Sequence, residues 1–122
     1  MKPGEQGLTR IISATRYSWL GIKAAWRHEA AFRQELTIAV IGFPLAIWLA
    51  RDAVEFLLLV VPLLLLMLIE LVNSAIEAVV DRFGGELHEL SGRAKDMGSA
   101  AVFMAIVITG LSWVAILANI YL

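Results

Sequence analysis

Three long stretches of this 122-residue chain contain no charged side chain: residues 36–50, 56–69 and 97–122. A helix needs roughly 20 mostly apolar residues to cross the hydrocarbon core of a bilayer. We therefore expect each stretch to belong to a membrane-spanning helix. The last stretch is long enough alone, whereas the first two must be extended by neighbouring residues. The predicted spans lie at residues 31–50, 53–74 and 98–120.

The overall composition supports a membrane protein. Hydrophobic residues make up 60% of the chain and charged residues 17%, whereas a soluble domain carries about 25% charged residues. The chain has no cysteine, which excludes disulfide scaffolds and thiolate metal sites. A net charge of −1 argues against a nucleic-acid partner. We expect an all-α membrane protein with one domain, residues 1–122, because this length leaves room for a single compact unit.

Residues 1–28 are predicted to form an amphipathic helix on the membrane surface. At 100° per residue, one stripe is apolar and a neighbouring face carries Arg16, Lys23 and Arg27. The apolar stripe consists of Leu8, Ile11, Trp19, Ile22 and Trp26. Aromatic and aliphatic residues beside a basic face are typical of a helix at the headgroup boundary. The same stripe could also pack on the protein's own bundle.

The basic residues predict which side of the membrane each part occupies. The N-terminal segment 1–35 has six Lys and Arg residues, the segment between the second and third spans has three, and the turn at 51–55 has one. The positive-inside rule places the more basic segments in the cytoplasm. We expect a cytoplasmic N-terminus, a cytoplasmic helix end and loop at 75–97, and a periplasmic C-terminus.

Glu70 interrupts the second uncharged stretch and begins a polar stripe. It lies sixteen residues after Val54, roughly 24 Å along a core of about 30 Å, and therefore just inside the cytoplasmic boundary. Its helix face also carries the side chains of Asn73, Ser74, Glu77 and Asp81. Carboxylates at this boundary suit Mg²⁺ and the phosphates of a substrate. A carboxylate in partly apolar surroundings can also accept a proton.

Simpler interpretations stay open for these residues. Glu77 and Asp81 could solvate a helix end, with Arg82 or Lys95 as partners, and Glu70 could be a polar clamp between helices. Glu29 and Arg33 have the i, i+4 spacing of an ordinary ion pair. Because Glu29 lies at the same boundary as Glu77, it could instead supply a second metal ligand.

The segment before the third span contains two cations, Arg93 and Lys95. We expect them to lie at the same depth in the membrane as Glu77, where they could pair with phosphates. Ser91 is expected to cap the third spanning helix. The chain contains neither a phosphate-binding G-x-x-x-x-G-K-[ST] loop nor the motifs of protein kinases. A nucleotide would have to be held by a metal ion, loop cations and polar helix faces.

Two strings of residues closely resemble the prokaryotic diacylglycerol kinase family. They read Glu70-Leu-Val-Asn73-Ser74-Ala-Ile-Glu77-Ala-Val-Val-Asp81-Arg82 and Glu89-Leu-Ser91-Gly92-Arg93-Ala-Lys95-Asp96-Met-Gly98-Ser99. The likeness covers essentially the whole chain. It implies a homotrimeric bacterial inner-membrane enzyme that transfers the γ-phosphoryl group of ATP to the hydroxyl of diacylglycerol, giving phosphatidic acid in lipid recycling. It also implies an active site shared between neighbouring subunits.

The resemblance further implies roles for individual residues. Glu70 would be the general base and Asn73 would orient it, while Glu29 and Glu77 would hold the Mg²⁺ that bridges the ATP phosphates. The nucleotide would be bound by Glu29 and Glu77 together with Arg10, Tyr17, Glu86, Leu87, His88, Lys95 and Asp96. The lipid substrate would be bound by Glu70 together with Arg10, Ala14, Trp19, Gln34, Trp48, Ser99 and Trp113.

Three alternatives remain at this stage. An undecaprenol kinase of the same fold would share the carboxylate face, and the spans do not reveal the shape of the lipid. A small proton-coupled multidrug transporter also buries a membrane glutamate, but such proteins usually have four spans and a carboxylate near the midplane. A purely structural membrane subunit gives no reason for Glu70 and Glu77 to lie seven residues apart.

Overall fold

The computed structural model describes residues 3–83 and 88–122, which form four α-helices. The helices are α1 (Gly7–His28), α2 (Ala30–Leu49), α3 (Ala53–Asp81) and α4 (Glu89–Tyr121). Helices α2, α3 and α4 are each long and apolar enough to cross a membrane. This confirms the predicted all-helical fold with three candidate spans. Glu86 and Leu87, both predicted to bind ATP, lie outside the described residues.

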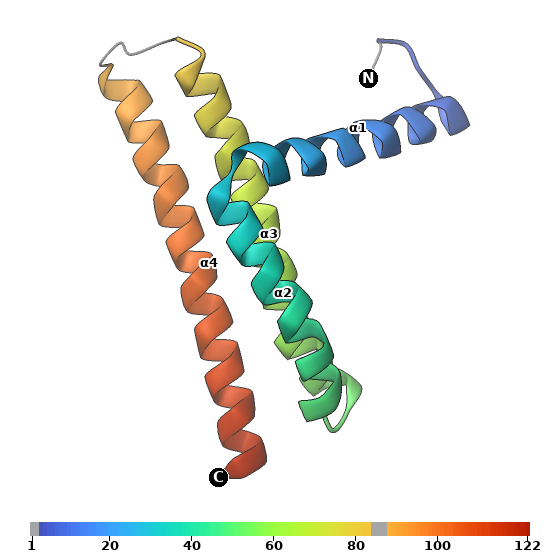
Figure 1. The fold of residues 1–122 in the computed structure, drawn as a ribbon, viewed down its shortest axis with the longest axis vertical. Helices are drawn as coiled ribbons and strands as arrows, with labels where there is room; N and C mark the ends of the chain where they lie inside the picture. The colour runs from blue at the N-terminus through green and yellow to red at the C-terminus, as the bar shows by residue number, and fades with distance from the viewer. Residues whose placement is uncertain (1–2, 84–87) are drawn as a thin grey trace.

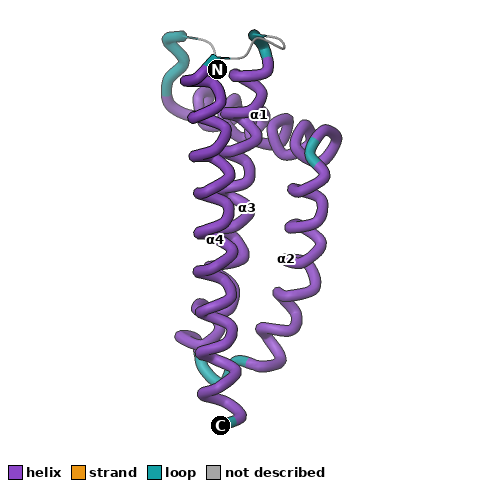
Figure 2. The backbone as a smooth tube through the Cα atoms, turned by 90° about the vertical axis from the view of Figure 1, so that its left-hand side faces the viewer, coloured by secondary structure: helices purple, strands orange, loops and turns teal. Residues whose placement is uncertain are grey.

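Helix α3 is the centre of the bundle, because it packs against both α4 and α2 (Figure 1). Helix α1 projects sideways from the end of the bundle where α3 finishes and α4 begins. The turn between α2 and α3 lies at the other end, together with the C-terminus (Figure 2). The charged segments 1–35 and 70–96 therefore meet at one end, which we name the charged end; the other is the turn end.

Two helices extend well beyond the predicted spans. Helix α3 has 29 residues and α4 has 33, so each is longer than about 40 Å and exceeds a hydrocarbon core of about 30 Å. Helix α4 begins at Glu89, and the imidazole Nδ1 of His88 accepts a hydrogen bond from the backbone N–H of Leu90 at 3.1 Å. The prediction that Ser91 caps this helix is therefore wrong, because Ser91 already lies within its first turn.

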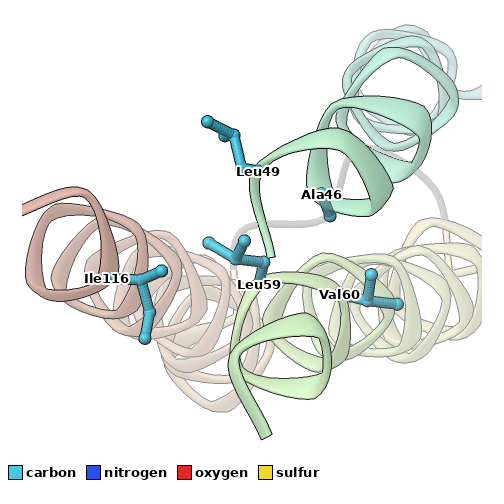
Figure 3. Packing of buried hydrophobic residues seen from close by; sticks show 5 residues of the cluster. All are labelled: Ala46, Leu49, Leu59, Val60 and Ile116. Carbon is cyan, nitrogen blue, oxygen red and sulfur yellow. The ribbon is translucent and has the colours of Figure 1, made fainter. Parts of the chain in front are cut away.

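A small hydrophobic core joins the three long helices near the turn end (Figure 3). It consists of Ala46 and Leu49 from α2, Leu59 and Val60 from α3, and Ile116 from α4. Many large apolar side chains on the same helices are exposed. An exposed apolar surface of this extent fits helices surrounded by acyl chains or by other subunits, and not by water.

Pro62 lies inside α3, and α4 compensates for the backbone bond that it removes. Proline has no N–H, so the carbonyl of Leu58, four residues earlier, has no helical partner. The hydroxyl of Ser112 on α4 donates a hydrogen bond to this carbonyl. The indole Nε1 of Trp113 donates to the next carbonyl, that of Leu59, at 2.9 Å. These bonds fix the register of α4 against α3, as neighbouring helices can do for a proline within a membrane.

A buried carboxylate ties the turn end together. The side chain of Glu55 is 8% exposed, and its Oε2 lies 2.6 Å from the guanidinium Nη2 of Arg51. Glu55 also accepts a hydrogen bond from the backbone N–H of Arg51 at 2.9 Å and one from the amide of Asn119 at 3.4 Å. Asp52 caps α3 by accepting from the backbone N–H of Glu55 at 2.8 Å. The turn is thereby attached to the C-terminal part of α4.

We expect Arg51→Met to destabilise the protein more than Arg93→Met does. Removing Arg51 leaves the buried Glu55 carboxylate without its cation, and an uncompensated buried charge is unfavourable. Arg93 pairs with Glu89 at 3.0 Å on the surface, where both side chains are more than half exposed, and such pairs contribute little.

Unfolding in mixed micelles with increasing SDS measures the difference. The double variant Arg51→Met/Glu55→Gln should regain part of the lost stability, because the amide carries no charge. Equal SDS midpoints of unfolding for the Arg51→Met and Arg93→Met variants would show that the pair of Arg51 and Glu55 does not stabilise the protein more than the surface pair does.

Candidate active site at the charged end

The polar stripe of α3 runs from the interior of the bundle to its surface. Glu70, Asn73 and Ser74 are buried, with exposed fractions of 4%, 7% and 9%. Further along the helix Glu77 is half-buried and Asp81 is exposed. All five side chains follow one face because they are three, four, seven and eleven residues from Glu70. The structure thus places Glu70 at the apolar end of the stripe.

Asn73 joins the stripe to α4 through a very close approach. With the Asn73 side chain as it lies, a Cβ atom at position 98 would overlap the amide oxygen of Asn73, so glycine allows the close approach of the two helices here. The amide Nδ2 of Asn73 donates a hydrogen bond to Oε1 of Glu77 at 3.3 Å. Because a carboxylate can only accept, this bond also fixes which way the amide points. Gly98 therefore positions Glu77 through Asn73.

Glu29 occupies the elbow between α1 and α2, where the backbone is extended (φ −118°, ψ 107°). Arg33 does not pair with it. The guanidinium of Arg33 instead donates to the carbonyls of Trp26 and Arg27 at 2.7 and 3.3 Å, where a cation stabilises the C-terminus of α1. Of the two interpretations left open for Glu29, the structure therefore does not support the ion pair with Arg33, and the Glu29 carboxylate is left available for another partner.

A groove of about 560 Å³ separates α1 from α3 beside this elbow. Glu29, His28 and Ser18 line it from the side of α1, and Ser74 lines it from α3. Ser74 is buried, and its hydroxyl lies close enough to the Glu70 carboxylate to interact with it. The groove therefore borders the inner end of the stripe as well as the elbow at Glu29.

Four carboxylates from three elements surround the inner end of the stripe. Those of Glu29 and Glu77 lie close enough to Glu70 for their negative charges to repel it. Glu35 on α2 also lies close enough to Glu70 for the two carboxylates to repel each other, and its Oε2 is buried without a partner among the described residues. Glu35 was not among the predicted site residues. The signal that could have identified it is its place as the last charge before the stretch 36–50.

Lys95 brings a cation to the outer end of the stripe. Its Nζ lies 2.9 Å from Oδ1 of Asp81, and it is also near enough to Glu77 to attract it. The simpler interpretation of Asp81, a helix-end carboxylate paired with Lys95, agrees with this geometry. Asp96, next in sequence, is exposed.

Some predicted site residues lie far from Glu70 within one chain. Trp113 belongs to the turn-end part of α4, fifteen residues and about 22 Å along the helix from Gly98. Trp48 is exposed near the same end of α2. Arg10 lies eighteen residues before His28, about 27 Å along α1 and away from the bundle (Figure 1). The remaining predicted residues lie on α1 or toward the charged end: Ala14, Tyr17, Trp19, Gln34 and Ser99.

The residues at the charged end can supply part of a metal site. Among residues 3–83 and 88–122, no three acidic or histidine side chains are close enough together to hold a metal ion. Mg²⁺ is usually bound by one or two carboxylates together with substrate phosphates and water. Glu29 and Glu77, both near Glu70 and neither paired with an arginine, match this chemistry.

We expect Gly98→Ala to lower kcat about tenfold or more while the protein still folds. The added methyl group would displace the Asn73 amide and with it Glu77, and such overpacking typically costs about 1–3 kcal/mol. Gly110→Ala is the matched control, because α4 leaves open space around Gly110. Assays of the phosphoryl transfer that the family resemblance implies, together with thermal unfolding of both variants, test this. A similar loss of activity in the two variants would show that the effect of Gly98→Ala does not depend on the contact with Asn73.

Comparison with known proteins identifies the family. The family model for prokaryotic diacylglycerol kinase matches residues 16–117. The chain is 55% identical to the diacylglycerol kinase of Escherichia coli K12 over 111 residues, which cover 91% of each chain. It is 51% identical to the diacylglycerol kinase of Haemophilus influenzae over 111 residues, covering 91% of this chain and 94% of the relative.

A more distant relative agrees over nearly the full length. The diacylglycerol kinase of Helicobacter pylori 26695 is 42% identical over 120 residues, covering 98% of this chain and 94% of the relative. These relatives do not favour the polyprenol kinase, the multidrug transporter or the structural subunit. This small helical membrane protein, with its buried carboxylate stripe, belongs to the prokaryotic diacylglycerol kinase family.

Proposed function

We propose that the chain transfers the γ-phosphoryl group of ATP to the free hydroxyl of diacylglycerol, with Glu70 as the general base. The observation that carries this proposal is the stripe of α3, which leads from buried Glu70 to half-buried Glu77 beside the groove at Glu29. A lipid hydroxyl reaches a membrane protein from the apolar end of such a stripe, and a nucleotide reaches it from the water. Donor and acceptor would therefore meet along one helix face.

Glu70 would act on the acceptor. Its carboxylate would take the proton of the lipid hydroxyl while the hydroxyl oxygen bonds to the γ-phosphorus and the bond from that phosphorus to the leaving ADP oxygen breaks. Phosphoryl transfer depends mainly on positioning and on neutralising charge. Asn73, held between Gly98 and Glu77, would keep the polar side chains of α3 at a fixed spacing during this step.

Glu29 and Glu77 would hold Mg²⁺ together with the phosphates of ATP. The bound ion would neutralise charge on the phosphates. Because Glu29 lies at the elbow between α1 and α2 and Glu77 lies on α3, this pair would also attach the elbow to α3. Without that cation the neighbouring carboxylates repel one another.

Lys95 would bind the nucleotide at the outer end of the stripe, where Asp81 already holds it near Glu77. Asp96 and His88 would contribute from the start of α4. Arg10 and Tyr17 lie on the part of α1 that extends from the bundle (Figure 1), so they would serve the site of a neighbouring subunit. This arrangement fits the homotrimer that the family resemblance implies.

The lipid-binding residues divide in the same way. Gln34 and Ser99 would contact the headgroup region near Glu70 together with Ala14 of α1. Trp19, which was predicted to bind the same lipid, lines a groove on the opposite side of α1. Trp48 and Trp113 lie toward the turn end, where they would meet acyl chains. We infer that the charged end faces the cytoplasm of the bacterial inner membrane, as its basic residues predict, and that the C-terminus faces the periplasm.

We expect Glu70→Gln to lower kcat by at least about 100-fold, the range in which a general base typically contributes. MgATP binding should persist, because Glu70 is not among the proposed metal ligands. Glu77→Gln should weaken MgATP binding as well as turnover. Kinase assays in mixed micelles measure kcat, and the binding of a fluorescent ATP analogue with Mg²⁺ measures affinity.

Glu89→Gln is the matched control, because this substitution makes the same chemical change at an exposed residue of the charged end. It should retain near-normal kcat and affinity. Near-normal turnover by Glu70→Gln would remove Glu70 from the mechanism.

The substrate assignment has its own test. Purified protein given ATP and either dioleoylglycerol or undecaprenol should phosphorylate the glycerolipid, with phosphatidic acid as the product detected by thin-layer chromatography. Turnover of undecaprenol alone would overturn the assignment and favour the polyprenol kinase. The Glu70→Gln variant should be inactive with either lipid, so this experiment separates the choice of lipid from the choice of base.

A further inference from the structure

A second groove lies on the other side of α1 from the candidate active site. It encloses about 430 Å³ and is lined by Trp19, Ile22, Lys23, Trp26, Arg27 and Leu36. Successive helical residues are separated by about 100°. The side chains of α1 that line this groove are therefore centred about 150° from those that line the groove at Glu29, and only Ile22 borders both. The two grooves are distinct.

The second groove is lined mainly by apolar surface, with two cationic residues on α1 and one leucine on α2. Lys23 and Arg27 lie on α1, which crosses the end of the bundle (Figure 1). Leu36 lies six residues into α2, about 9 Å along the bundle from the start of that helix. The indoles of Trp19 and Trp26 lie beside the two cations. A ligand with a charged head and a hydrocarbon tail fits this order of side chains.

The charge of α1 specifies the sign of that head. Between Gly7 and His28 the helix carries Arg10, Arg16, Lys23 and Arg27 and no carboxylate. Within the described residues, the ion pairs are made by Arg51, Arg93 and Lys95, so neither Lys23 nor Arg27 is neutralised by a carboxylate there. Diacylglycerol has no charge and would gain nothing from two cations. A phosphate would gain from both.

We propose that the groove between α1 and α2 binds an anionic phospholipid of the surrounding leaflet as a non-substrate ligand, with Lys23 and Arg27 holding its phosphate. One acyl chain lies along Leu36, and the indoles of Trp19 and Trp26 flank the glycerol region. The bound lipid fixes α1 against the leaflet and so holds the elbow that carries Glu29. The lipid is recognised by its charge, whichever alcohol the phosphate carries.

Quenching by brominated lipids tests this inference with binding as the readout. The variant Trp48→Phe/Trp113→Phe retains Trp19 and Trp26 as the fluorophores of the groove. It is placed in dioleoylphosphatidylcholine vesicles that contain a minor fraction of brominated phosphatidylglycerol, brominated phosphatidylcholine or brominated diacylglycerol. We expect the phosphatidylglycerol to quench preferentially. In that background, Lys23→Gln and Arg27→Gln should each lower the preference about fivefold, and Lys23→Arg should keep it.

Arg16→Gln is the matched control, because it removes one charge from the same face of α1 outside the groove. It should leave the preference unchanged. Equal quenching by all three lipids, preferential quenching by diacylglycerol, or an equal loss with Arg16→Gln would each overturn the proposal. So would the absence of quenching by any lipid, which would mean that protein covers the groove. Circular dichroism checks that each variant folds, and mass spectrometry of retained lipids gives the same comparison with all four tryptophans in place.

Discussion

The close approach of α3 and α4 at Asn73 and Gly98 is the constraint on which the rest of the charged end depends. Gly98 has no Cβ atom, and the amide of Asn73 occupies the space where one would lie. Its hydrogen bond to Glu77 then sets that carboxylate one helical turn beyond the contact. Glu70, three residues before Asn73, is also buried. A small loss of space at Gly98 would therefore change the spacing between the proposed base and the proposed metal ligand.

Contacts at the turn end also fix the position of α4 against α3. Ser112 and Trp113 satisfy the carbonyls of α3 next to Pro62, and Asn119 reaches the buried carboxylate of Glu55. These bonds are specific to one register of α4 on α3, whereas Leu and Val side chains could pack in several. Apolar surfaces gain little by leaving lipid for one another, so polar contacts and close packing specify the arrangement of helices in a membrane. The two ends together hold the stripe of α3 in place.

The distribution of charge predicted the fold well, since it located three spans and brought the two charged segments to one end. The distribution of charge did not predict the contacts between side chains of different helices. Arg33 is four residues from Glu29, yet it caps α1 because the elbow turns the last carbonyls of that helix toward it. The proximity of Glu35 to Glu70 depends on how α2 packs on α3, and the spacing of residues within one helix does not predict this packing. The resemblance to a family supplied the roles of Glu70 and Glu77, and the structure adds the neighbours that position them.

Helix α1 separates two kinds of electrostatic environment. The groove toward α3 contains Glu29 and lies next to other carboxylates, so a bare anion is repelled there and a phosphate needs a bound cation to enter. The groove toward α2 contains Lys23 and Arg27, which attract phosphates directly. An anionic lipid is therefore drawn to the second groove and excluded from the first, although both open at the same end of the bundle. A neutral lipid alcohol is not sorted in this way, and it can approach Glu70 without competition from the charged lipids that surround it.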